Sequence, residues 1–208
     1  MFVIHYNFFS DYLKSITDVP IIMPDRPWQV SPADFYGNWK QYQVLWLLHG
    51  TFGDHSDWLR KSNIELYAAE KDLVVVMPSA LNSNYSNWDG FMMGFGMFDF
   101  LTEELMPLVY GWLPVSDKRE DNFIAGLSMG GRGAIKYAVN HPEKFAAAAI
   151  LSAVPMDFTE IRPGHPNVML NSSDARLKRS IENAGGLAAF QNSSENVWAI
   201  IDELAPSG

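Results

Sequence analysis

The chain has 208 residues, enough to bury one hydrophobic core but few for two large domains. Hydrophobic residues make up 48% and charged residues 19%, the balance of a folded globular protein rather than a disordered one. The net charge of -9 provides no basic face for a nucleic-acid backbone, and the lack of cysteine excludes disulfides, thiolate metal sites and a cysteine nucleophile. We therefore expect a single domain over residues 1–208 that does not bind nucleic acid.

The start of the chain gives no targeting signal. Residues 1–9 lack the basic start and the unbroken apolar stretch of a secretory signal. No segment reaches the roughly 20 apolar residues that a membrane-spanning helix needs. We expect a soluble, cytoplasmic protein with no membrane partner.

Two short runs rich in aromatic and β-branched residues open the chain. Residues 2–9 and 16–23 predict two antiparallel strands. Pro20 lies inside the second run and cannot donate to a ladder, so we expect this strand at an edge or end of the sheet. Residues 25–42, rich in proline, glycine and polar groups, predict a connection.

From residue 43 onward, apolar strand-like runs alternate with amphipathic helical stretches, which is typical of βαβ units and a parallel sheet. The predicted strands are residues 43–48, 73–77, 122–127 and 145–151. The predicted helices are residues 58–70, 98–112, 132–140, 175–183 and 196–204. Residues 162–174 predict a loop. The fold class is therefore α/β, with a mostly parallel central sheet and helices on both faces.

A Gly-x-Ser-x-Gly motif, Gly126-Leu127-Ser128-Met129-Gly130, stands between a predicted strand and a predicted helix. That context is what a nucleophile elbow requires. A serine in so sharp a turn leaves no room for side chains two positions before and after it, and Gly126 and Gly130 meet this demand. We predict that Ser128 is the nucleophile of a serine hydrolase. The alternative is a tight turn in which Ser128 only caps the helix.

A second motif, residues 46–53, is an apolar strand that runs into a His-Gly pair. Hydrolases with a nucleophile elbow take one oxyanion donor from the N–H after the nucleophile and another from a loop in this position. The expected donors are the backbone N–H groups of Met129 and Thr51, in preference to that of Phe52.

Two histidines in this region invite other interpretations. We expect His49 to support the loop by bonding backbone groups rather than to act as a base, because in this architecture the base follows the nucleophile. His55, between Asp54 and Asp57, could suggest a metal site, but these residues are also typical of a helix start with Ser56 or Asp57 as the N-cap. We expect no metal.

Residues 85–98 mix aromatic residues, methionines and glycines after a predicted strand. They favour two interpretations equally on composition. One is the wall of an apolar acyl pocket, and the other is a long loop that packs its own side chains onto the sheet.

Three blocks, residues 47–58, 75–78 and 118–131, resemble the tributyrin esterases, which are bacterial carboxylesterases related to esterase D and S-formylglutathione hydrolase. The likeness runs from about residue 2 to residue 155. It implies an α/β-hydrolase that hydrolyses short-chain acyl or acetyl esters, small-molecule substrates, through an acyl-serine intermediate and without a cofactor.

The resemblance also assigns roles to single residues. It implies Ser128 as the nucleophile and the N–H groups of Thr51 and Met129 as oxyanion donors. Arg132 departs from the aromatic residue that members usually carry there, so we expect a different pocket lining.

The family places its acid and then its histidine after the nucleophile, on loops that follow two further strands. The sequence predicts no such strands, so we expect an incomplete domain with the last strands missing. His141 precedes Pro142 at a predicted helix end, where histidine usually bonds the last carbonyl groups. His165 remains as a candidate base, but it lies at most eight residues from Asp157 and Glu160, too close for the strand and helix that normally separate acid and base.

Without a base, a serine hydroxyl is a poor nucleophile near neutral pH. The sequence therefore predicts a serine esterase whose activity in this chain is impaired unless a second chain supplies the histidine. Two other functions stay open: a non-catalytic remnant that binds a ligand or partner, and an acyltransferase that uses the same serine. A homo-oligomer is also left open.

Overall fold

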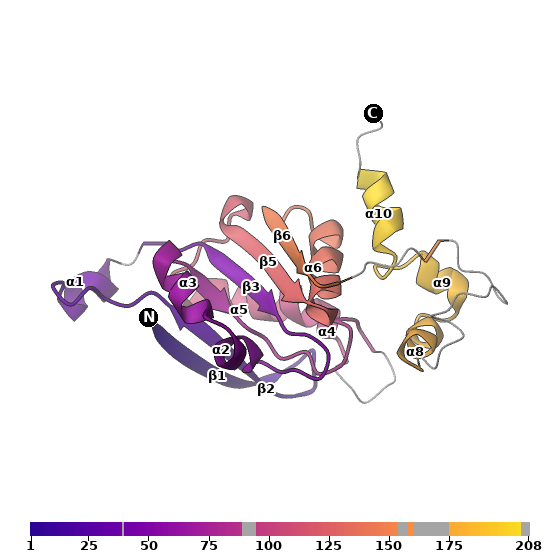
Figure 1. The fold of residues 1–208 in the computed structure, drawn as a ribbon, viewed down its shortest axis with the longest axis horizontal. Helices are drawn as coiled ribbons and strands as arrows, with labels where there is room; N and C mark the ends of the chain where they lie inside the picture. The colour runs from indigo at the N-terminus through magenta and orange to yellow at the C-terminus, as the bar shows by residue number, and fades with distance from the viewer. Residues whose placement is uncertain (39, 89–94, 154–157, 160–174, 205–208) are drawn as a thin grey trace.

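The computed structural model describes residues 1–38, 40–88, 95–153, 158–159 and 175–204, and a six-stranded sheet lies at its centre (Figure 1). The strands are β1 (Phe2–Ser10), β2 (Ser15–Met23), β3 (Val44–Leu48), β4 (Val74–Val76), β5 (Asn122–Leu127) and β6 (Ala147–Leu151). Their order across the sheet is β1-β2-β4-β3-β5-β6. β2 pairs antiparallel with β1 and with β4, and the other neighbours run parallel. The predicted mostly parallel sheet is confirmed.

Helices cover both faces of this sheet (Figure 1). The helical segments are α1 (Pro32–Gly37), α2 (Asp57–Lys61), α3 (Ile64–Lys71), α4 (Met97–Asp99), the π-helical turn η1 (Phe100–Leu105), α5 (Met106–Trp112), the 3-10 turn η2 (Arg119–Asp121), α6 (Met129–Asn140), α8 (Ala175–Asn183), α9 (Leu187–Gln191) and α10 (Val197–Leu204). Because strand side chains alternate, Trp46 of β3 packs with η1, α5 and α6, whereas Leu47 packs with α2 and α3. None of the helices in the described ranges is long and apolar enough to cross a membrane.

The helix predicted over residues 98–112 is present but changes pitch where it meets Pro107. A proline lacks the N–H that an α-helix needs and its ring crowds the preceding turn. The turn before it, η1, is π-helical, and the Met106 N–H reaches back to the Leu101 carbonyl oxygen. The helix therefore continues through the proline.

The expectation that the second strand lies at a sheet edge is wrong, because β2 lies between β1 and β4. Pro20 is tolerated there because of its position at the end of the short ladder with β4. Its carbonyl oxygen accepts from the Met77 N–H at 3.0 Å, while the pairs between β2 and β4 begin only at Ile21. The position where Pro20 lacks an N–H therefore lies just beyond the last pair of the β2–β4 ladder, so no bond within that ladder is lost.

The other boundaries follow the sequence closely. The helix predicted over residues 58–70 is divided into α2 and α3 at Ser62. The Ser62 hydroxyl donates to the Trp58 carbonyl oxygen at 2.6 Å, and the backbone at Ser62 is extended. The connection at residues 25–42 contains α1, and α9 is a further helix that the sequence pattern does not predict. The loop predicted over residues 162–174 lies outside the described residues.

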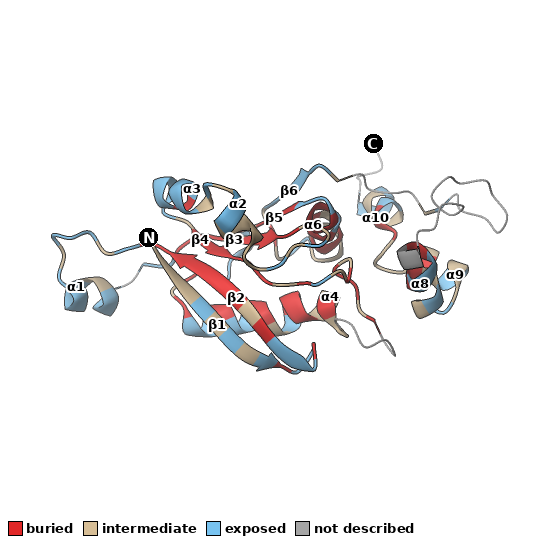
Figure 2. Cartoon of the chain, turned by 60° about the horizontal axis from the view of Figure 1, so that its bottom comes forward, coloured by how far each residue is buried: buried red, intermediate tan, exposed pale blue. Residues whose placement is uncertain are grey.

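The C-terminal helices α8, α9 and α10 lie at one end of the sheet, on the side of α6 (Figure 1). At the same end, β6 is the last strand of the sheet and all five of its residues are exposed (Figure 2). The residues of β6 are apolar throughout, as in a parallel strand buried on both faces, yet here they are exposed to solvent.

Candidate active site

Ser128 stands where β5 ends and α6 begins, at the carboxyl end of the parallel strands (Figure 1). Its backbone has φ 54° and ψ -111°, a conformation that costs an L residue about 1–3 kcal/mol. The Ser128 N–H donates to the Leu151 carbonyl oxygen at 2.8 Å, and the Ser128 carbonyl oxygen accepts from the Arg132 N–H at 3.1 Å. Neighbouring backbone therefore holds the strained turn on both sides.

The serine is exposed and its side chain makes no capping bond to α6. The alternative that Ser128 serves only as a helix cap is therefore wrong. What the structure presents is a hydroxyl on a sharp strand-to-helix turn, which is the arrangement that a nucleophile elbow needs.

The two motif glycines are required by close backbone approach. A Cβ on Gly126 would lie 2.2 Å from the carbonyl group of Gly130, and a Cβ on Gly130 would lie 2.4 Å from the carbonyl oxygen of Leu48. Either contact is far inside van der Waals distance. Only glycine at both positions lets α6 start directly against β3 and β5.

The start of α6 favours negative charge beside Ser128. Met129 is the first residue of this 12-residue helix, and the first N–H groups of a helix have no partner within it. These groups and the helix dipole stabilise an anion at the N-terminus. Met129 therefore lies next to Ser128 at this N-terminus.

The loop after β3 lies directly beside the nucleophile. A Cβ built on Gly50 would be 3.6 Å from the Ser128 Cβ, so the backbone that leads into Thr51 passes next to the serine. The Phe52 N–H donates to the Asn82 Oδ1 at 2.8 Å. Phe52 is thereby occupied as a donor.

His49 is locked into the loop, as the sequence predicts. Its Nε2 accepts from the Ala80 N–H at 2.8 Å, so the proton lies on Nδ1, which faces the Gly50 carbonyl oxygen at 2.8 Å. The side chain is buried, and burial lowers the pKa of His49 below its ordinary value. A neutral ring with both nitrogens engaged supports the backbone and cannot serve as the general base.

Tyr85 is a supporting residue that sequence reasoning missed. Its hydroxyl donates to the His49 carbonyl oxygen at 3.0 Å, and its ring packs against Gly133 of α6, where a Cβ would come within 2.7 Å. This side chain therefore joins the oxyanion loop to the helix that carries Ser128. No local pattern could have indicated it, because the bond joins loops 36 residues apart.

For the segment 85–98, the described side chains favour the packing interpretation. Tyr85 and Met97 belong to the main hydrophobic core, and the Trp88 indole donates to the Ser83 carbonyl oxygen at 2.6 Å. Residues 89–94, which carry the middle of the proposed acyl wall, lie outside the described residues.

The structure does not bring a histidine base to Ser128 within the described ranges. His141 caps the far end of α6, about 18 Å from the serine by helix length, and its ring stacks on Phe98 with Nδ1 3.5 Å from Glu143. The ring lies near this carboxylate, and its Nε2 has no hydrogen-bond partner among the described residues, so it does not bond the last helix carbonyls. The remaining candidate, His165, and its suggested partners Asp157 and Glu160 lie outside the described residues.

The acidic loop near His55 forms a helix start. The Asp54 carboxylate accepts from both the N–H and the hydroxyl of Ser56, and Ser56 is the N-cap of α2. These bonds lower the pKa of Asp54. Across the described ranges, no three His, Asp or Glu side chains are grouped to hold a metal ion.

Comparison with known proteins places this geometry in a family. Residues 23–199 match the family model Esterase, described as "Putative esterase". An acetyl esterase of Caldicellulosiruptor saccharolyticus is 32% identical over 154 residues, which make up 74% of this chain and 56% of that protein. The chain thus spans little more than half the length of this relative.

Two solved structures share the fold. FphF, a fluorophosphonate-binding serine hydrolase of Staphylococcus aureus, has a TM-score of 0.78 and 31% identity over 97% of this chain and 72% of its own. The S-formylglutathione hydrolase FrmB of Staphylococcus aureus has a TM-score of 0.73 and 28% identity over 98% of this chain and 74% of its own. One is named a serine hydrolase and the other an S-formylglutathione hydrolase, and the sheet they share with this chain is that of an α/β-hydrolase. With the family match over residues 23–199, the chain belongs to the Esterase family of esterase D-like α/β-hydrolases.

Proposed function

We propose that this chain carries the nucleophile and oxyanion hole of a serine carboxylesterase that acts on short-chain acyl or acetyl esters. Ser128 attacks the ester carbonyl carbon, the alcohol leaves, and water then hydrolyses the acyl-serine. The N–H groups of Met129 and Thr51 hold the negative oxygen of each tetrahedral intermediate. Removing one such donor typically costs about a hundredfold or more in rate.

One observation carries this proposal: an exposed serine on a strained turn, with a second loop packed against its Cβ. The Ser128 backbone is strained at φ 54° and ψ -111°, and its side chain makes no capping bond that would offset this strain. Strain of this kind is typical of functional sites. The closeness of Gly50 to the Ser128 Cβ supports an oxyanion hole formed by these two backbone segments. The acetyl esterase relative supports a small acyl group.

Activity of the chain by itself is proposed to be low. Within the described residues, the Ser128 hydroxyl has no hydrogen bond to a histidine, and both ring nitrogens of His49 are engaged elsewhere. An oxyanion hole without a base still gives about 10³–10⁴-fold acceleration over water. Because this residual acceleration does not use the serine, we expect the part of the turnover that depends on Ser128 to be small in the chain by itself.

The test compares the chain with Ser128→Ala on p-nitrophenyl acetate and p-nitrophenyl butyrate. We expect slow hydrolysis that falls in the variant by the small part that depends on Ser128. A fluorophosphonate probe measures activation separately, because labelling of Ser128 needs an activated hydroxyl. Turnover equal in both proteins would reject the esterase assignment for this chain, and rapid labelling would contradict the expected lack of a base.

A further inference from the structure

Two exposed apolar residues near the nucleophile have a strained backbone. Phe52 has φ 63° and Leu81 has φ 50°, and the two residues are 90% and 54% exposed. A positive φ is uncommon for a residue other than glycine and is an outlier for a bulky one. Packing in the core does not offset the strain, because both side chains face solvent.

Each of these residues occupies a turn position that favours glycine. Phe52 is the third residue of the turn 50–53, closed by a hydrogen bond of 3.1 Å from the N–H of its last residue to the carbonyl oxygen of its first. Leu81 is the second residue of the turn 80–83, closed in the same way at 3.2 Å. Turns with a positive φ at one of these positions favour glycine there. The turns therefore do not require large apolar side chains.

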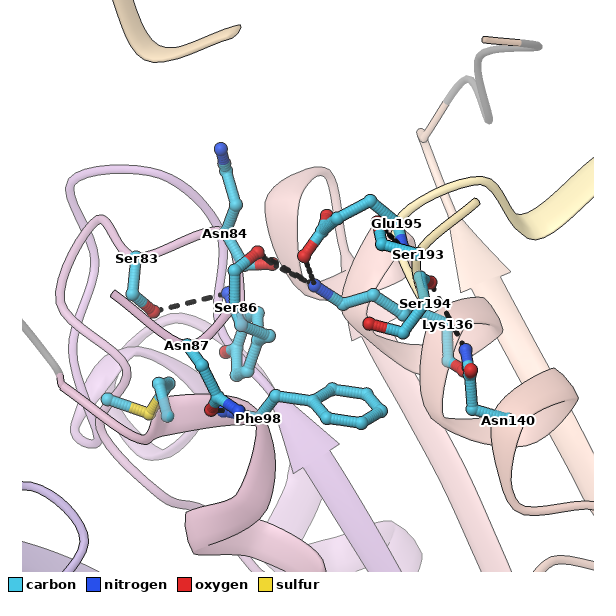
Figure 3. A network of polar contacts seen from close by, with 12 residues as sticks. Ser83, Asn84, Ser86, Asn87, Phe98, Lys136, Asn140, Ser193, Ser194 and Glu195 are labelled. Atoms are coloured by element: carbon cyan, nitrogen blue, oxygen red, sulfur yellow. Dashed lines mark hydrogen bonds and ion pairs between the residues drawn. The ribbon is translucent and has the colours of Figure 1, made fainter. Parts of the chain in front are cut away.

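A third large residue with a positive φ shows how such strain is offset within the fold. Tyr85 has φ 53°, but it is 1% exposed and its hydroxyl bonds the loop after β3. The buried Lys136 amine holds the backbone beside it, because it donates to the Asn84 carbonyl oxygen at 3.1 Å, to Ser86 Oγ at 2.8 Å and to Glu195 Oε1 at 2.9 Å (Figure 3). The two exposed side chains have no such burial. Strain kept without it is typical of residues that contact a ligand.

The two strained residues belong to an apolar row that starts beside the nucleophile. Leu127, the residue before Ser128, is 42% exposed, and its Cγ lies 3.9 Å from a Cβ built on Gly50. Phe52 is two residues beyond Gly50, and its N–H bonds the side chain of the residue after Leu81 at 2.8 Å. The row thus crosses the end of β5 and the loops after β3 and β4, which are neighbouring parallel strands (Figure 2). Since neighbouring strands lie about 4.8 Å apart, we expect it to extend about 10 Å.

We propose that Phe52 and Leu81 bind an apolar alcohol group of the ester substrate. This assignment rests on the proposed esterase function, in which the acyl group is short. A short acyl group on Ser128 does not reach along a row of about 10 Å, so the alcohol side of the ester is the part that covers it. Removal of apolar surface from water supplies the affinity, and an aromatic ring on the substrate packs well against Phe52.

The test measures ester binding to the Ser128→Ala protein by nuclear magnetic resonance titration. We expect 2-phenylethyl acetate to give saturable shifts of the Phe52 and Leu81 backbone amide signals. 2-Methoxyethyl acetate has the same acyl group and a polar alcohol, and it should bind at least about tenfold more weakly because it buries less apolar area. Methyl 3-phenylpropanoate is an isomer of the first ester with its ring on the acyl side. With the ring on the row, its carbonyl lies one atom nearer the ring and misses the proposed oxyanion donors, so it should bind at least about threefold more weakly.

Phe52→Gly and Leu81→Gly, made in the Ser128→Ala protein, separate binding from stability. We expect each to weaken binding of 2-phenylethyl acetate at least about tenfold. Neither should lower the urea midpoint of unfolding, because glycine adopts a positive φ without strain. A side chain with a merely structural role would lose stability instead. Trp28→Gly removes a residue that is 83% exposed in the connection before α1, and it should leave binding unaltered.

These measurements do not depend on turnover, because the Ser128→Ala protein lacks the nucleophile. A lack of serine-dependent hydrolysis in the unmodified chain would reject the esterase proposal and leave the binding result standing. Three results would each overturn the assignment of the row: no saturable shifts with 2-phenylethyl acetate, equally tight binding of either other ester, or glycine variants that both bind like the Trp28→Gly protein.

Discussion

At the scale of single residues, the candidate site depends on atoms that never touch a substrate. The Tyr85 hydroxyl and the Asn82 amide oxygen each bond one backbone group of the loop that faces Ser128, and the Ala80 N–H donates to the His49 ring. In such a site, a displacement of about 1 Å can cost a hundredfold in rate. The loop is therefore positioned from outside the motif that predicts it.

Tyr85→Phe should reduce serine-dependent ester hydrolysis tenfold or more, because the His49 carbonyl oxygen loses its donor beside Gly130. The buried, unpaired oxygen should also cost about 1–3 kcal/mol of unfolding free energy. Tyr137→Phe is the matched control, since that buried hydroxyl donates to the Met97 carbonyl oxygen at 2.9 Å and not to the loop. p-Nitrophenyl acetate turnover and urea unfolding separate the two effects. Equal activity losses in the two variants would contradict a positioning role for Tyr85.

His49 should make the fold sensitive to mild acid. Burial lowers its pKa in the folded state, so below its ordinary pKa of 6.5 the unfolded chain binds the proton more readily than the folded one. The stability due to neutral His49 is therefore complete above pH 6.5 and is lost as pH falls below it, by at most about 1.4 kcal/mol per pH unit.

Urea unfolding at pH 7.5 and pH 5.5 measures this loss. His49→Gln should show a smaller difference between the two pH values than the unmodified protein, whereas His5→Gln, at an exposed position of β1, should not. Identical pH dependence in the His49 variant would show that the ring is not held neutral by burial.

At the scale of elements, α6 has two tasks. Its first turn carries Ser128 and Met129, and its second half anchors the C-terminal helices through Lys136. Asn140 adds a second anchor, because its amide donates to the Ser194 carbonyl oxygen at 3.2 Å. The helix that presents the nucleophile is thus also the support on which α10 packs.

The Lys136–Glu195 pair should respond unequally to the loss of either partner. Burial lowers the pKa of Lys136, whose side chain is 4% exposed, whereas that of Glu195 is 22% exposed and can turn to water. Glu195→Gln, which leaves a buried amine without a counter-charge, should cost about 3 kcal/mol, and Lys136→Met should cost less, about 1–2 kcal/mol. Urea unfolding of both variants measures the difference, and the reverse order would be incompatible with this burial asymmetry.

At the scale of the whole molecule, β6 is the edge strand on one side of the described sheet. β6 continues the parallel series on one side, and its five apolar, uncharged residues are exposed (Figure 2). An unprotected apolar edge strand tends to pair with another chain. The net charge of -9 repels other copies of the chain, but none of this charge lies on β6 itself.

Self-association through β6 should therefore increase with protein concentration and with salt, which screens the net charge. Ala149→Lys places a charge on the edge strand and should suppress light scattering. Ala188→Lys adds the same charge at an exposed position of α9 and should have a smaller effect. If both lysine variants scatter light alike, β6 is not the surface responsible.

Local sequence signals predicted much of the sheet. β5 has the predicted bounds, and β3, β4 and β6 lie within the predicted ranges. The glycines around Ser128, between a predicted strand and a predicted helix, indicated the elbow. These features depend on neighbours along the chain, on strand patterning and on room in a turn, so they can be read without the fold.

Tertiary structure decided which residues far apart in the sequence form hydrogen bonds and charge pairs. Only the fold brings together three pairs of groups. The Phe52 N–H donates to the Asn82 side-chain oxygen, the Ala80 N–H to the His49 ring, and the Met77 N–H to the Pro20 carbonyl oxygen. The Lys136–Glu195 pair likewise joins residues 59 positions apart. Hydrogen bonds and charge pairs of this kind leave no periodic trace in a sequence, because their partners are chosen by packing in space and not by spacing along the chain.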